Sequence, residues 1–89
     1  MFQTKKLERL VRGFANHRRI EILNLLDKEP ELSVFDMART LGVNFKTISE
    51  HARRLAVAGL VMKRNEGQAV RHALTKQGKV ILMFLRTLE

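Results

Sequence analysis

The sequence lacks cysteine altogether and contains a single proline, Pro30. Without cysteine, the chain can form neither a disulfide nor a thiolate metal site to reinforce a small core. Long apolar runs are also missing, since the longest, Val80 to Leu85, is far shorter than a membrane span. The start, Met1 to Lys6, has no apolar signal-peptide core. We therefore expect an intracellular chain with no membrane partner.

Acidic residues are scarce beside basic ones. The chain has nine Asp and Glu residues and 17 Lys and Arg residues, which gives a formal net charge of +8 and a pI near 10.9. A chain this basic attracts polyanions, of which nucleic acid is the usual one. The basic residues do not gather on one amphipathic helix, as membrane-surface binding would require. The length of 89 residues predicts one small domain, 1–89.

The spacing of apolar residues predicts four helices before residue 60. The first is marked by apolar residues at intervals of three and four, from Leu7 to Phe14. Capping residues, glycines and the proline supply the boundaries of the others. The predicted helices are 5–14, a second between the Asn16 cap and Pro30, a third opened by a capping box from Ser33 to Asp36 and ended by Gly42, and a fourth between the Asn44 cap and Gly59.

After Gly59 the period of the pattern changes. Residues 60–64 and 69–74 are short strand-like runs, and the turn 65–68 between them suits a hairpin with Gly67 at positive φ. Thr75 can cap a last helix that runs to the C-terminus. The predicted order is ααααββα, a mainly α fold with a small β-hairpin, which is the order of a winged helix-turn-helix.

The segment Val34 to Leu55 fits a DNA-binding helix-turn-helix. Such a motif needs a small residue where its helices touch, a glycine in the turn and a branched apolar residue that anchors the second helix. Ala38, Gly42 and Ile48 occupy these positions. Two helices joined by a glycine turn are common in other folds, but the following hairpin and the basic composition favour DNA binding.

Three stretches are similar to those of a known family: 14–23 (FANHRRIEIL), 41–51 (LGVNFKTISEH), and 58–61 (AGLV) with the later pairs Glu66-Gly67 and Leu74-Thr75. The chain thereby resembles the ArsR (arsenic-repressor-type) family of bacterial and archaeal winged-helix regulators. The resemblance implies a homodimer joined through the first and last helices, with each recognition helix in a major groove. We expect such a protein in the cytoplasm, associated with the nucleoid.

Metal-sensing members of that family use cysteines, or Asp/His and His/Glu sets on the last helix. This chain has no cysteine, and residues 76–89 contain no histidine. His17, His51 and His72 show no ligand spacing with one another or with a close carboxylate. We expect no metal and no cofactor. The sequence also lacks a phosphate loop, a nucleophile elbow and paired carboxylates, so we expect no enzymatic activity.

The outer face of the fourth helix would enter a DNA groove, because its other face belongs to the core. Recognition helices present their N-terminal residues to base edges. Lysine favours guanine acceptors, and glutamate can accept from a cytosine amino group. An aromatic ring suits a thymine methyl or, equally, packing at the helix start. The base-reading candidates are Phe45, Lys46, Thr47, Ser49 and Glu50.

Other polar residues of this helix and of the hairpin would contact the DNA backbone. Arginines on phosphates hold register and supply salt-dependent affinity, although each could instead be a solvated surface charge. Residues at the hairpin tip could reach the minor groove or the backbone. The backbone and wing candidates are Asn44, Arg53, Arg54, Arg64, Asn65, Gln68 and Arg71.

The first and last helices, 1–14 and 76–89, carry apolar faces that predict a dimer interface. The last helix is apolar almost all round, since Leu82 and Met83 extend its main face, and the rest of a small chain can cover one side of it. The alternative is a monomer whose last helix folds back over its own domain. The interface candidates are Leu7, Leu10, Val11, Phe14, Val80, Ile81, Phe84, Leu85 and Leu88.

The function predicted from these features is sequence-specific binding of double-stranded DNA by a homodimer that represses transcription at an inverted-repeat operator. Two alternatives stay open. One is an architectural protein that binds DNA without sequence preference, which the net charge allows. The other is a winged helix used for protein or RNA interaction, which the charges on the fourth helix disfavour.

Overall fold

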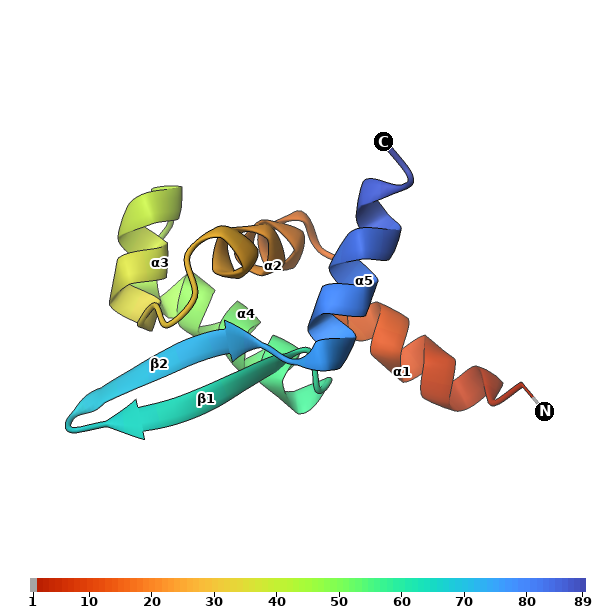
Figure 1. Cartoon of the computed structure of the whole chain (residues 1–89), viewed down its shortest axis with the longest axis horizontal. Coiled ribbons are helices and arrows are strands. Elements are labelled where there is room, and N and C mark those ends of the chain that lie inside the picture. The colour runs from red at the N-terminus through yellow and green to blue at the C-terminus, as the bar shows by residue number, and fades with distance from the viewer. Residues whose placement is uncertain (1) are drawn as a thin grey trace.

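The computed structural model describes residues 2–89 of the chain. Its elements follow the predicted order, four helices, a two-stranded antiparallel hairpin and a fifth helix, and form a winged helix-turn-helix fold that is mainly α (Figure 1). The bounds are α1 Thr4–Phe14, α2 His17–Lys28, α3 Val34–Leu41, α4 Phe45–Val57, β1 Val61–Glu66, β2 Ala69–Leu74 and α5 Lys76–Arg86.

Side-chain caps fix where four of the helices begin. The Asn16 side chain accepts hydrogen bonds from the backbone N–H groups of α2, and the Ser33 hydroxyl and Asp36 carboxylate form a reciprocal capping box at α3. Asn44 caps α4, and the Thr75 hydroxyl caps α5. All four predicted caps are confirmed. Each accepts from N–H groups that the first helical turn leaves without partners.

The core lies around α2, which packs against α4, α5 and β2. Burial of its apolar side chains is the main driving force for folding. The side chains that are almost completely buried come from most elements, and they are Ile22, Leu23, Leu26, Met37, Ile48, Leu55, Leu60 and His72.

The hairpin is longer than predicted, and its turn is tighter. Strand β1 continues to Glu66, which pairs with Ala69, so Asn65 lies in the strand opposite Val70 rather than in the turn. Only residues 67 and 68 connect the strands. Gly67 has the predicted positive φ, 62°, and the residue after it does not, which is the pattern of a type II′ turn.

A bridge outside the hairpin fastens β2 to the segment before α3. The His72 N–H donates to the Leu32 carbonyl at 2.9 Å, and the Glu31 N–H donates to the His72 carbonyl at 2.8 Å. The His72 ring is buried, with 1% of its surface exposed. The sequence pattern did not predict this bridge, because Leu32 stands alone between Pro30 and the capping box.

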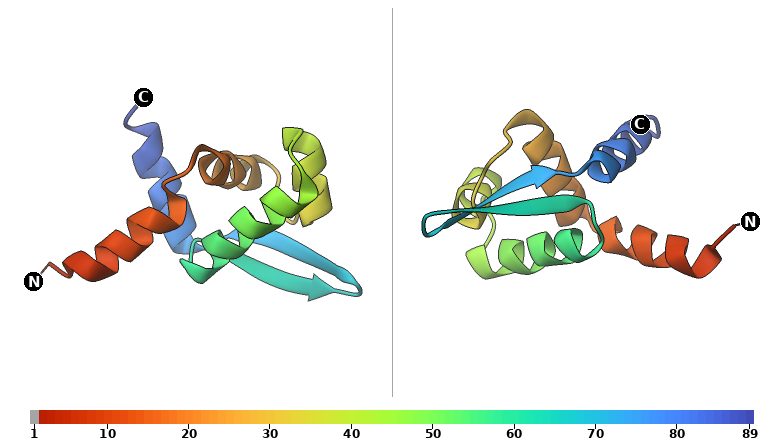
Figure 2. Two further views of the ribbon diagram at one scale, coloured as in Figure 1. Left: turned by 180° about the vertical axis from the view of Figure 1, so that it is seen from behind. Right: turned by 60° about the horizontal axis from the view of Figure 1, so that its bottom comes forward.

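The molecule is elongated, with extents of 43 × 28 × 21 Å. The tip of the hairpin and the free end of α1 lie at opposite ends of the long axis (Figure 1). Helix α4 runs alongside the hairpin, and α1 projects away from the other elements (Figure 2). Among residues 2–89, no helix is both long enough and apolar enough to cross a membrane.

Helix α1 is fastened at its C-terminal end. Phe14 is buried in the core, with 8% of its surface exposed, and Gly13 lies so close to α4 that an added methyl group would come within 2.5 Å of the Ala58 Cβ atom. Leu10 packs partly against the core. The preceding residues of the helix are exposed.

Candidate nucleic-acid interface

Helices α3 and α4 form the helix-turn-helix that the sequence predicted. Ala38 lies at the contact between the helices with 8% of its surface exposed, and Ile48 is fully buried. Gly42 ends α3 in the left-handed conformation, with φ at 67°. The Val43 N–H donates back to the Ala38 carbonyl at 3.0 Å, which closes the turn.

The N-terminal half of α4 presents a polar surface to solvent. Four of the five base-reading candidates are exposed and Ser49 is half-buried, which leaves it accessible at the edge of this face. Phe45 keeps 56% of its surface exposed, so packing at the helix start covers less than half of it. The side chain of Asn44 is engaged as the helix cap, accepting from the Lys46 N–H at 2.7 Å and the Thr47 N–H at 3.3 Å.

One carboxylate on α4 holds two arginines. The Arg53 guanidinium donates to both oxygens of Glu50, at 3.1 and 2.5 Å, and the Arg54 Nε donates to the same carboxylate at 3.4 Å. The hydrogen bond from Arg53 is the main reason why the pKa of Glu50 falls to about 2. Glu50, which we predicted to read bases, and Arg53 and Arg54, which we predicted to contact the DNA backbone, therefore form one hydrogen-bonded network. The sequence did not predict that these residues contact one another.

The two wing arginines are also paired with carboxylates. Arg64 contacts Glu31 and, at 3.3 Å, Glu66. Arg71 lies 3.4 Å from the Glu66 carboxylate and 3.9 Å from the carboxylate of Asp36. The hydrogen bond from Arg64 lowers the pKa of Glu66. Asn65 and Gln68 remain exposed near the hairpin tip.

Glu31 was missed by sequence reasoning. It lies in the connection between α2 and α3, and it is the only residue other than glycine with a positive φ, 70°, among residues 2–89. Its partner Arg64 is 33 positions away in the sequence. Its only local sequence signal is that it follows Pro30, which does not indicate an ion pair.

Arg19 links α1 to α4. Its guanidinium donates to the carbonyls of Arg12 and Gly13 at 3.1 and 3.3 Å, and its Nε donates to Nδ1 of His51 at 3.1 Å. Burial, followed by the positive charge of Arg19, lowers the pKa of His51, which favours the neutral ring that this hydrogen bond requires. The sequence placed His51 on the core stripe of α4, but it did not show this partner.

His72 has a structural role beneath the connection before α3. Nδ1 of His72 lies 3.0 Å from the Leu32 carbonyl, which can only accept, so Nδ1 carries the proton. Burial lowers the pKa of His72. Within residues 2–89, no three His, Cys, Asp or Glu side chains are grouped closely enough to hold a metal ion.

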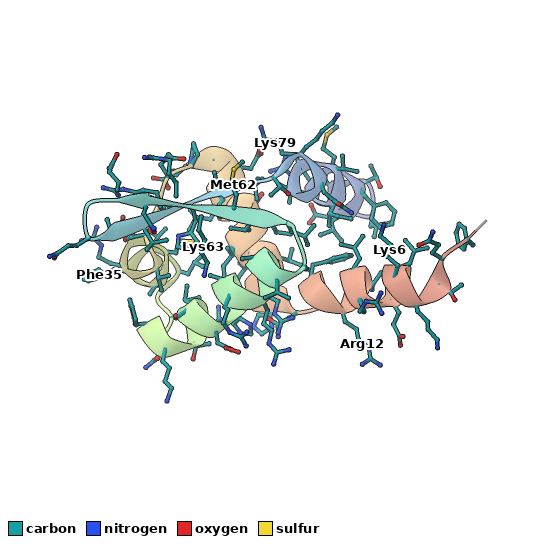
Figure 3. All side chains as sticks on the ribbon, turned by 90° about the horizontal axis from the view of Figure 1, so that it is seen from below. Lys6, Arg12, Phe35, Met62, Lys63 and Lys79 are labelled. Carbon is teal, nitrogen blue, oxygen red and sulfur yellow. The ribbon has the colours of Figure 1, made fainter. Side chains whose placement is uncertain are left out.

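The outer face of α4 and one side of α1 point in the same direction. Figure 3 shows Arg12 extending from α1 on the side where the exposed side chains of α4 lie, whereas Lys79 of α5 extends from the opposite edge. Arg12 is paired with Glu8 at 3.2 Å. The exposed side chains of α4 and Arg12 are thus displayed on a surface distinct from the edge where Lys79 of α5 extends.

A family model described as HVO_A0114 matches residues 15–77, which include α2, the helix-turn-helix and the whole hairpin. The chain belongs to the HVO_A0114 family. The match covers the part of the chain that carries the candidate interface and ends at the start of α5.

Solved structures with this fold place the HVO_A0114-family chain among ArsR-like winged-helix regulators. Mb0332 of Mycobacterium bovis, described as a homodimeric winged helix-turn-helix DNA-binding domain and a possible ArsR-family regulator, is 27% identical over 96% of this chain and 79% of its own, with a TM-score of 0.86. HlyU of Vibrio cholerae is 32% identical over 99% of this chain and 97% of its own, with a TM-score of 0.84.

A transcriptional regulator, HlyU of Vibrio vulnificus, is also 32% identical, over 96% of this chain and 88% of its own, with a TM-score of 0.77. The resemblance to the ArsR family predicted from the sequence is confirmed. Both Mb0332, as a possible one, and HlyU of Vibrio vulnificus are described as transcriptional regulators.

Proposed function

We propose that this HVO_A0114-family protein binds double-stranded DNA as a homodimer and represses transcription at an inverted-repeat operator. The observation that supports it most is the exposed polar N-terminal half of α4, held in a helix-turn-helix and flanked by a basic wing. A recognition helix contacts base edges through this part of its surface. A protein with this role acts in the bacterial or archaeal cytoplasm, where the nucleoid lies.

In this proposal the roles on the DNA surface divide by position. Lys46, Thr47 and Ser49 read base edges at the start of α4, together with Phe45 and Glu50. Arg53 and Arg54 lie further along the helix and meet phosphates, as do the wing arginines. Phosphate contacts supply affinity and register, whereas base contacts supply sequence preference.

The proposed dimer uses the apolar surface of α1 and α5 that the protomer leaves open. Leu7 and Val11 expose 39% and 49% of their surfaces, and Val80, Phe84 and Leu88 expose more than half of theirs. Leu10, Ile81 and Leu85 pack partly against their own core, so they contribute edges to the interface. Phe14 and Leu82 are buried in the protomer and support the interface from beneath. An open groove of about 1020 Å³ between α1 and α4 adds apolar surface there.

The proposal is tested by selecting bound duplexes from a random-sequence pool at a stated salt concentration. We expect enrichment of an inverted repeat whose half-sites are about 34–36 Å apart, one turn of DNA. Binding without enrichment would support the architectural alternative. Absence of DNA binding at low salt would leave the winged helix as a protein- or RNA-interaction module.

Variants of α4 separate base reading from backbone contact on the selected duplex. Lys46→Ala and Ser49→Ala should weaken preference at particular base pairs, by about 1–3 kcal/mol each for a direct contact. Arg53→Ala should weaken binding to selected and scrambled duplexes alike. Lys79→Ala removes the same charge as Lys46→Ala but from α5, outside the helix-turn-helix, and it should leave sequence preference unchanged. Equal losses on both duplexes for Lys46→Ala and Ser49→Ala would contradict the base-reading assignment.

A further inference from the structure

All four arginines proposed to meet DNA phosphates are paired with carboxylates of their own chain. Glu50 holds the two arginines of α4, and the wing arginines are held by carboxylates from three places: the connection before α3, the capping box and β1. The pairs are Arg53–Glu50, Arg54–Glu50, Arg64–Glu31, Arg64–Glu66, Arg71–Glu66 and Arg71–Asp36. By contrast, within residues 2–89 no ion pair includes Lys46 or Lys63.

Among these carboxylates, only that of Glu31 belongs to a residue whose backbone has the left-handed φ that side chains other than glycine avoid. A left-handed φ is costly for a glutamate and persists where the surrounding structure fixes it. That surrounding structure is β2. The Glu31 N–H donates to the His72 carbonyl, and the Glu31 carbonyl accepts from Arg71 at 3.5 Å. The backbone of Glu31 is therefore tied to the wing, and its carboxylate meets the Arg64 guanidinium there.

We propose that Glu31 competes with DNA phosphates for the Arg64 guanidinium and thereby weakens sequence-independent DNA binding. This inference rests on the proposed DNA-binding function. A carboxylate and a phosphate offer the same kind of partner to an arginine fork, so the two are alternatives. The pair is exposed to solvent, with about half of each side chain accessible, and an exposed ion pair is weak enough to be exchanged.

The competition has two measurable consequences. Non-specific binding is almost wholly electrostatic, so an arginine already paired contributes less to it. When Arg64 leaves Glu31 for a phosphate, the favourable free energy of the new ion pair is reduced by the free energy lost with the Glu31 pair. When Arg64 is paired with Glu31, it also displaces fewer counterions from DNA, which makes affinity less dependent on salt.

Glu31 is a sharper test of this idea than the other carboxylates. Glu50 is a base-reading candidate, so its substitution would change two properties at once. Glu66 contacts both wing arginines. For Glu31 the chain offers a matched control, Glu29, which is exposed, lies two residues earlier and belongs to no ion pair among residues 2–89. The variants Glu31→Gln and Glu29→Gln change the net charge equally.

The experiment measures binding to a short random-sequence duplex across about 50 to 200 mM salt. We expect Glu31→Gln to bind about two- to fivefold more tightly than the wild type, the range that an exposed ion pair supports. The slope of log affinity against log salt should become steeper, by no more than about 0.9, the value for one whole phosphate contact, because Arg64 still contacts Glu66 in the variant. Glu29→Gln should produce the smaller change that net charge alone causes, with an unchanged slope.

Two further variants keep the test decisive. Glu31→Asn also removes the carboxylate, and asparagine adopts the left-handed conformation more readily, so it carries the measurement if Glu31→Gln folds poorly. In an Arg64→Gln background, Glu31→Gln should have no larger effect than Glu29→Gln. The inference is overturned if Glu31→Gln, or Glu31→Asn in its place, matches Glu29→Gln in affinity and slope. If the wild type binds no duplex even at about 50 mM salt, the proposed function fails first, and the inference fails with it.

Discussion

Gly42 and Glu31, at the two ends of the segment that holds α3, both have a left-handed backbone, for different reasons. At position 42 a glycine adopts it at low steric cost, and a Cβ atom added there would meet nothing within 4 Å. At position 31 a glutamate adopts it under constraint from β2. The first was predictable because glycine after an apolar helix is a strong stop signal. The second was not, because its cause lies about 40 residues away along the chain.

Replacing Gly42 measures the free energy that the left-handed conformation costs at the turn of the helix-turn-helix. Because the space around the position is open, Gly42→Ala should lower the free energy of unfolding by about 1–2 kcal/mol, through the left-handed conformation alone. Gly42→Asn should cost less, since asparagine tolerates that conformation. Urea unfolding of the three proteins measures both. An alanine variant as stable as the wild type would contradict this reading of the turn.

At the scale of elements, the sequence predicted what local chemistry determines. Caps, glycines and apolar periods placed every helix start within two residues, because each signal acts on its own turn of the chain. The pairing of the wing with Leu32 and the ion pairs across it depend on contacts between distant segments. His72 shows the limit, since alternation placed it on a face of β2 but not beneath the connection before α3.

The buried His72 should make the stability of the wing side of the fold dependent on pH. Burial lowers its pKa in the folded state, so the unfolded chain binds a proton that the folded chain resists. The stability it provides is complete above the ordinary histidine pKa of about 6.5 and is lost progressively as pH falls below that value. From pH 7.5 to pH 5, the free energy of unfolding of the wild type should therefore fall by more than that of His72→Gln, which has no titrating group at this position.

Thermal or urea unfolding at each pH provides this comparison. Using the difference between the two proteins removes the contribution of His51, whose pKa is also lowered and which is present in both. A difference that stays constant across this pH range would show that His72 is not protonated preferentially in the unfolded state.

At the scale of the whole molecule, the open apolar surface is concentrated on the two helices at one end. Sequence periodicity located these apolar faces, but it could not show which of their residues are buried in the protomer and which remain exposed for an interface. Packing makes that separation: Leu82 turns into the core, whereas Val80 and Phe84 on the same helix remain more than half exposed. A small chain with such faces gains burial by pairing with a copy of itself.

Charging that surface should separate the protomers without unfolding them. We expect the wild type to sediment as a dimer at micromolar concentration and the double variant Val80→Glu, Phe84→Glu to sediment as a monomer. Both positions are exposed in the protomer, so its core stays intact. The control is Phe35→Glu with Met62→Glu, which charges two exposed apolar residues outside α1 and α5 and should remain dimeric. A monomeric wild type, or a control that dissociates equally, would contradict the proposed interface.

The brace that Arg19 forms between α1 and α4 has a consequence for the geometry of the DNA site. In a dimer joined through α1, the separation of the two recognition helices depends on how α1 is held against α4 within each protomer, by the packing of Gly13 and Phe14 and by the hydrogen bonds of the Arg19 guanidinium to two carbonyls and a histidine. Each base pair inserted between half-sites rotates one of them by roughly 35° about the DNA axis, since a turn takes about 10 to 10.5 pairs. A rigid link between α1 and α4 does not follow that rotation, so we expect the proposed dimer to lose affinity when one base pair is inserted between the half-sites.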